Sequence, residues 1–88
     1  MIFNTDSQKF KSMKKQEREF LEDIEDALGD WEYQTDAYHE NEYFCVDVTI
    51  DMDDWGGNAD EIWDALSDVA SEWGAGIDSD MNTYYLAL

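Results

Sequence analysis

The charges of this chain are divided along its length, and that division limits how the chain can fold. All five basic residues lie between positions 9 and 18. Residues 19–88 contain no Lys or Arg, yet they hold every one of the 23 acidic residues except Asp6 and Glu17. Carboxylates without nearby basic partners are costly to bury and repel one another. Self-repulsion on this scale costs folding stability, so the fold has to offset it.

Composition indicates one folded domain. A chain of 88 residues is long enough for a single modest core. Hydrophobic residues make up 43% of the chain and aromatic residues 15%, which separates it from a disordered acidic tail. We therefore treat residues 1–88 as a single domain. No apolar run reaches membrane length, and no signal-peptide core is found. The single cysteine, Cys45, favours a reducing compartment. We therefore expect a cytoplasmic protein.

The first predicted element is a helix over residues 6–28. Thr5 and Gln8 resemble a capping box at its start, and Gly29 is a natural stop at its end. The apolar side chains recur at helical spacing, with Glu17 interrupting the stripe. The stripe consists of Phe10, Met13, Phe20, Leu21, Ile24 and Leu28.

A β-hairpin is predicted next, over residues 31–38 and 43–52, with a turn at His39-Glu40-Asn41-Glu42. The second strand alternates strictly, with Phe44, Val46, Val48, Ile50 and Met52 on one face. In the first strand Trp31, Tyr33, Thr35 and Ala37 are the less polar set. If these faces meet the helices, four acids share the opposite face: Glu32, Asp36, Asp47 and Asp51.

A second helix is predicted after a loop at residues 53–57. Asn58 is expected to cap it and Gly74 to end it, with Ile62, Leu66, Val69 and Trp73 as its apolar stripe. Another face carries only acids, about 5 Å apart along roughly 16 Å of helix axis. These acids are Glu61, Asp64, Asp68 and Glu72, with Asp60 alongside.

The end of the chain, residues 83–88, predicts a buried strand, with residues 76–78 as a short partner strand across a turn. Together the elements predict an α+β fold in the order α-β-β-α-β(-β). In this fold, two helices cover one face of a small antiparallel sheet.

Signals for catalysis or metal binding are weak. His39 is the only histidine, no nucleophile accompanies it, and neither a phosphate-binding glycine loop nor zinc-ligand spacing is present. We therefore expect neither an enzyme nor a cofactor, and no catalytic residue is assigned. Residues 51–56 and 78–82 partly match calcium loops, and each departs from the full pattern, so divalent-cation binding stays a minor alternative.

The magnitude of the charge points to a class of partner. The formal net charge is −18. A domain of this length has a radius of gyration of about 12 Å, hence a diameter of roughly 31 Å. That length of duplex DNA carries about 18 phosphate charges. Such a chain is repelled by nucleic acid and by anionic membranes, so we expect no direct contact with either. The expected partner is a basic nucleic-acid-binding protein.

One segment resembles a known family. Residues 55–67, Trp-Gly-Gly-Asn-Ala-Asp-Glu-Ile-Trp-Asp-Ala-Leu-Ser, are similar to the motif of the barstar family of ribonuclease inhibitors. In that family a loop and helix plug the basic active site of the enzyme. The resemblance implies that Asp60 and Asp64 are inserted acids and that Trp55 and Gly57 lie in the contacting loop.

In composition the chain also resembles phage-encoded DNA mimics, which inhibit CRISPR and restriction systems. Both resemblances imply an inhibitor that presents carboxylates where a partner expects phosphates, acting in the cytoplasm of a bacterial host if phage-encoded. An immunity protein against a toxin nuclease and a halophilic interaction domain remain alternatives. The expected partner-binding residues are Asp53, Asp54, Trp55, Asp60, Glu61, Asp64, Asp68 and Glu72, and the sheet face of Glu32, Asp36, Asp47 and Asp51 is secondary.

Overall fold

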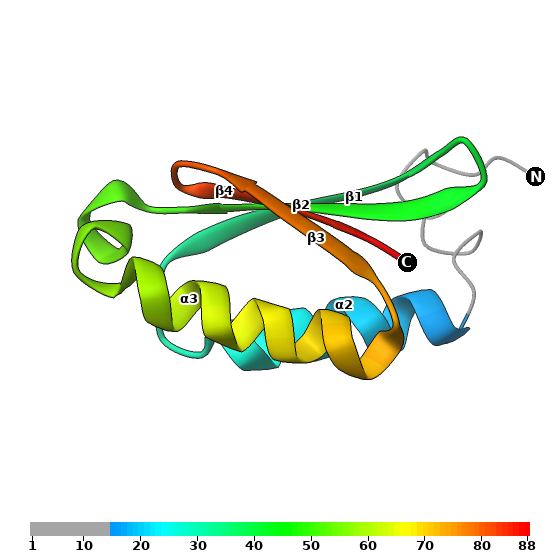
Figure 1. The fold of residues 1–88 in the computed structure, drawn as a ribbon, viewed down its shortest axis with the longest axis horizontal. Coiled ribbons are helices and arrows are strands. Elements are labelled where there is room, and N and C mark those ends of the chain that lie inside the picture. The colour runs from blue at the N-terminus through cyan, green and yellow to red at the C-terminus, as the bar shows by residue number, and fades with distance from the viewer. Residues whose placement is uncertain (1–14) are drawn as a thin grey trace, which may run out of the picture.

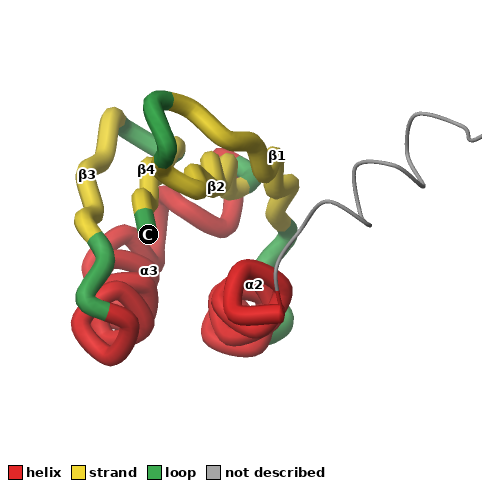
Figure 2. The backbone as a smooth tube through the Cα atoms, turned by 90° about the vertical axis from the view of Figure 1, so that its right-hand side faces the viewer, coloured by secondary structure: helices red, strands yellow, loops and turns green. Residues whose placement is uncertain are grey.

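A computed structural model describes residues 15–88 and confirms the predicted α+β class and element order (Figure 1). The described part contains two helices and a four-stranded sheet in the order β1-β2-β4-β3, with every neighbouring pair antiparallel. Figure 2 shows both helices beneath one face of the sheet, and no described element covers the other face. The elements are α2 (Lys15–Leu28), β1 (Tyr33–Glu40), β2 (Tyr43–Ile50), α3 (Met52–Trp73), β3 (Gly76–Asp80) and β4 (Thr83–Ala87).

Helix α2 confirms the second half of the first predicted helix. The start of that prediction, including the Thr5–Gln8 capping box, lies outside the described residues. Phe20, Ile24 and Leu28 are fully buried, as their spacing predicted. The helix ends where expected, because Gly29 adopts a left-handed conformation (φ 58°) that favours glycine.

The hairpin is tighter than predicted. Glu40 pairs directly with Tyr43, so the turn consists of Asn41 and Glu42 alone. Both turn residues have positive φ, 51° and 70°, the conformation that matches the twist of paired strands in two-residue hairpins. The alternation of β2 is confirmed, because the side chains from Phe44 to Ile50 on the predicted inner face are buried.

The loop predicted at residues 53–57 is wrong, because this segment forms the first turns of α3. Asp51 caps the helix, and its side chain accepts a hydrogen bond from the backbone N–H of Asp53 at 3.0 Å. Asn58, predicted as the cap, instead lies at a kink with non-helical backbone angles (φ −132°, ψ 15°). Its side-chain amide donates to the carbonyl of Asp54 at 2.8 Å. Met52, predicted at the end of the β2 alternation, becomes an exposed helical residue.

The C-terminal half of α3 and the last two strands follow the prediction closely. Gly74 ends the helix in a left-handed conformation (φ 65°). β3 runs two residues further than predicted, to Asp80, and β4 lies between β3 and β2. The core sits between the sheet and both helices. Its buried apolar residues are Phe20, Ile24, Leu28, Phe44, Val46, Val48, Ile50, Ile62, Leu66, Val69, Ala70, Tyr84 and Leu86.

Candidate acidic interaction surfaces

The acidic side chains of α3 form a continuous exposed stripe, here called the helix stripe. Ile62, Leu66 and Val69 are buried, so they fix the rotation of the helix and turn the acids away from the core. No Lys or Arg interrupts the stripe, because α3 contains none. The helix stripe consists of Asp60, Glu61, Asp64, Asp68 and Glu72, all exposed.

A second group of acids lies where the sheet meets the start of α3. The backbone N–H of Glu32 donates to Oδ2 of Asp54 at 2.7 Å, and the N–H of Asp51 donates to the carbonyl of Glu32 at 2.9 Å. These bonds tie the chain before β1 to the first turn of α3. We call Glu32, Asp51, Asp53 and Asp54 the acidic corner. From the sequence, Glu32 and Asp51 were assigned to the sheet face, and Asp53 and Asp54 to the loop before the second helix. The structure brings all four together.

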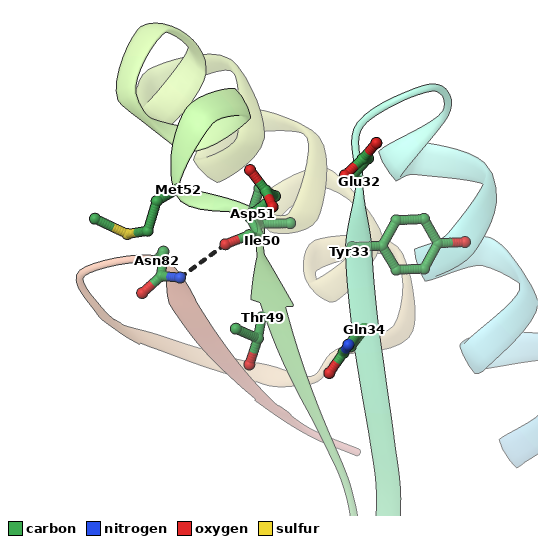
Figure 3. A pocket seen from close by; sticks show the side chains of 8 residues that line it. All are labelled: Glu32, Tyr33, Gln34, Thr49, Ile50, Asp51, Met52 and Asn82. Atoms are coloured by element: carbon green, nitrogen blue, oxygen red, sulfur yellow. Dashed lines mark hydrogen bonds between the residues drawn. The ribbon is translucent and has the colours of Figure 1, made fainter.

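A hollow of about 370 Å³ lies at this corner, between the ends of β1 and β2 and the start of α3 (Figure 3). The carboxylates of Glu32 and Asp51 lie at the same end of the hollow, near the start of α3. Asn82 closes another side, and its amide donates to the carbonyl of Ile50 at 2.7 Å. The hollow is therefore lined by polar groups that can accept a cationic side chain.

The aromatic residue predicted as an anchor is turned partly inward. Trp55 packs against the core, and its indole N–H donates to the hydroxyl of Tyr84 at 3.0 Å. Trp63 is more accessible, with a residue exposure of 38%, and lies between helix-stripe residues. Its ring also contacts Tyr84, with ring centroids 6.3 Å apart. The sequence offered a signal for Trp63, because this bulky residue falls outside the apolar stripe of its helix.

Two of the four acids predicted on the open face of the sheet, Asp36 and Asp47, lie in its strands, and this face also contains tyrosines. The other two, Glu32 and Asp51, lie just outside the strands, at the acidic corner. Asp36 of β1 lies directly opposite Asp47 of β2, which lies opposite Tyr85 of β4, which lies opposite Asp78 of β3. One row across the uncovered face therefore holds three carboxylates and an exposed phenol ring. Sequence reasoning missed Asp78 and Tyr85 as members of this face, because the position of β4 beside β2 could not be read from local alternation.

Tyr38 lies in the neighbouring row of this face and hydrogen-bonds Asp47. Its hydroxyl donates to both carboxylate oxygens of Asp47, at 3.1 and 3.3 Å. That hydrogen bond, together with burial and nearby negative charge, raises the pKa of Tyr38 to about 12. The phenol therefore remains neutral and holds the Asp47 carboxylate in place.

His39 and Cys45 are the remaining side chains whose chemistry could serve catalysis. His39 Nε2 lies 3.0 Å from Oε2 of Glu17, the one acid buried among residues 15–88. This pair joins α2 to the end of β1. His39 lies within β1 and pairs with Phe44, so it is not part of the turn, where it was predicted. Burial, followed by the charges of Glu40 and Asp47, raises the pKa of the Cys45 thiol.

No metal centre is assembled from residues 15–88, where no group of three or more His, Cys, Asp or Glu side chains could hold an ion. The segment that partly matches a calcium loop, residues 51–56, is the capped first turn of α3. Its backbone therefore follows a helix instead of wrapping around a cation.

Within the part of the chain that the structure describes, neither helix is long and apolar enough to cross a membrane. Comparison with protein-family models, with curated proteins and with solved structures yields no match. The functional argument therefore depends on the surfaces described above.

Proposed function

We propose that this protein is an inhibitor that blocks the basic nucleic-acid-binding site of a nuclease or other DNA- or RNA-binding protein by mimicking nucleic acid. One observation carries the proposal. Carboxylates are exposed on α3, on the acidic corner and on the open sheet face, and residues 19–88 contain no Lys or Arg to neutralise them. An ordinary soluble surface mixes both signs of charge, because solubility needs only a few net charges.

The helix stripe is the proposed primary contact. Its acids project from a rigid element, which holds them at a repeat of about 5 Å along the axis. A basic cleft that pairs with phosphates offers Lys and Arg side chains to such a row, and opposite charge accelerates the encounter. The acidic corner precedes the stripe along the chain, on the other side of the kink at Asn58. Trp63 supplies an accessible aromatic ring of the kind that interface hot spots use.

Within this proposal we favour a phage inhibitor of a CRISPR or restriction effector. The support is the composition, which resembles that of phage-encoded DNA mimics. A second candidate is an immunity protein that neutralises a toxin nuclease. The second part of the barstar-like segment, residues 58–67, favours it, whereas Trp55 and Gly57, which the resemblance places in a loop, lie in the first turns of α3. Both candidates use the same physical mechanism, and the identity of the captured partner distinguishes them.

Charge reversal on two helices tests the proposed contact. Asp64→Lys with Asp68→Lys alters the helix stripe, and Glu22→Lys with Asp26→Lys is the matched control on α2. Both pairs are exposed, one helical turn apart, and change the net charge equally. We expect the α3 pair to weaken binding of a nuclease captured from bacterial lysate by about 2–5 kcal/mol. The α2 pair should mainly slow association, and equal losses from the two pairs would contradict the assignment to α3.

A further inference from the structure

The uncovered face of the sheet contains a hollow of about 310 Å³, separate from the acidic corner. Its floor follows from the strand register. Cys45 of β2 lies opposite Ala87 of β4, which lies opposite Gly76 of β3, so three small residues occur side by side in one row. Tyr38 stands at the end of that row, opposite Cys45, and Tyr85 also lines the hollow. We call this hollow the tyrosine groove.

Two carboxylates border the tyrosine groove. Asp47 and Asp78 lie directly opposite Tyr85 on its two neighbouring strands. Both are held in position, Asp47 by the hydroxyl of Tyr38 and Asp78 by the backbone N–H of Ser79 at 2.8 Å. Tyr85 is an exposed residue, with 42% of its surface accessible, so it is available to a ligand.

We propose that the tyrosine groove receives an arginine side chain from the same basic partner, an inference that rests on the proposed function. The carboxylates supply the charge complementarity. The aromatic walls distinguish arginine from lysine, because a planar guanidinium stacks on a phenol ring while it hydrogen-bonds a carboxylate. The small residues of the floor leave room for the side chain to lie along the sheet. A second copy of this chain is a poor occupant, because it carries the same charge of −18.

Peptide titration of the isotope-labelled full chain tests this inference. The probes are an oligoarginine and an oligolysine peptide of equal length, followed by NMR of the backbone amides at near-physiological salt. We expect the arginine peptide to shift the signals of Cys45, Asp78 and Tyr85 and to bind about two- to fivefold more tightly than the lysine peptide. Tyr85→Leu should abolish this preference, and Tyr85→Phe, which keeps the aromatic ring, should retain it.

Two neighbouring acids of β3 supply a matched control. Asp78→Asn removes a charge from the groove, and Asp80→Asn removes the same charge two residues away, outside the lining of the groove. We expect a greater loss of arginine-peptide affinity from Asp78→Asn. Equal losses, equal affinity for both peptides, or shifts that depend on protein concentration without peptide would overturn the groove assignment. Shifts confined to α3 would overturn the groove assignment while leaving the proposed function intact. If the peptides bind neither α3 nor the groove, the groove assignment and the proposed function are both contradicted.

Discussion

The hydroxyl of Tyr38 donates to both carboxylate oxygens of Asp47, at 3.1 and 3.3 Å, and so links β1 to β2 on the open face of the sheet. Ionisation of the phenol would destroy this bond and add a negative charge beside a carboxylate. This explains why the pKa of Tyr38 is raised from 10.0 to about 12.

The raised pKa predicts how stability changes in alkali. A folded-state pKa above the unfolded value means that the contribution is fully present below pH 10 and is lost as the pH rises towards 12. Tyr33 adds to this loss, because burial and the charges of Glu25 and Asp26 also raise its pKa. Ultraviolet titration of the phenols should show a late-ionising tyrosine that disappears in Tyr38→Phe. Loss of the absorbance change near pH 10 in this variant, with the change near pH 12 retained, would contradict the assignment.

Cys45 should react slowly with alkylating reagents. Burial raises the pKa of its thiol, and the charges of Glu40 and Asp47 add to the effect, so little reactive thiolate is present near neutral pH. We expect the rate of iodoacetamide modification of the native protein to fall below that of the urea-unfolded chain. The variant Asp47→Asn should react faster than the parent, and an equal or slower rate would mean that Asp47 does not influence the thiol.

The sequence predicted the elements whose pattern is local. The alternation from Phe44 to Ile50 and the helical spacing of Ile62, Leu66 and Val69 each specify a buried face without reference to the rest of the chain. Gly29 and Gly74 marked helix ends because the left-handed conformation there favours glycine.

The errors arose where two weak local signals competed. Two adjacent glycines, Gly56 and Gly57, indicated a loop, yet the cap at Asp51 and the acids of the first turn sustain a helix through them. The acidic corner was missed for the same reason, because it forms only when Asp54, in the first turn of that helix, accepts a hydrogen bond from Glu32. The tyrosine groove depends on which strands are neighbours, and single-strand alternation contains no such information.

Removal of the helix cap should destabilise the fold measurably. Asp51→Ala deletes the acceptor for the backbone N–H of Asp53, and we expect the free energy of unfolding to fall by about 1 kcal/mol. Asp51→Asn removes the same charge but keeps a capping oxygen, so its loss should be smaller. Urea denaturation of both variants measures the difference. If Asn and Ala are equally destabilising, the side chain of Asp51 does not cap α3.

Salt should stabilise this protein without being required for folding. Screening reduces repulsion between exposed carboxylates, so the melting temperature should rise between dilute buffer and moderate NaCl. Circular dichroism at a series of salt concentrations measures the effect. Failure to fold in dilute buffer would favour the halophilic alternative. A melting temperature independent of salt would mean that the carboxylates are too far apart to repel one another.

Competition for a nucleic-acid site tests the central claim most directly. Labelled duplex DNA or RNA is bound to a nuclease captured by this protein, and fluorescence anisotropy is followed as the inhibitor is added. The account predicts that the inhibitor releases the nucleic acid completely, that its apparent affinity falls as nucleic acid or salt increases, and that it never binds the nucleic acid alone. A ternary complex of nuclease, nucleic acid and inhibitor, with nucleic-acid affinity unchanged, would contradict mimicry.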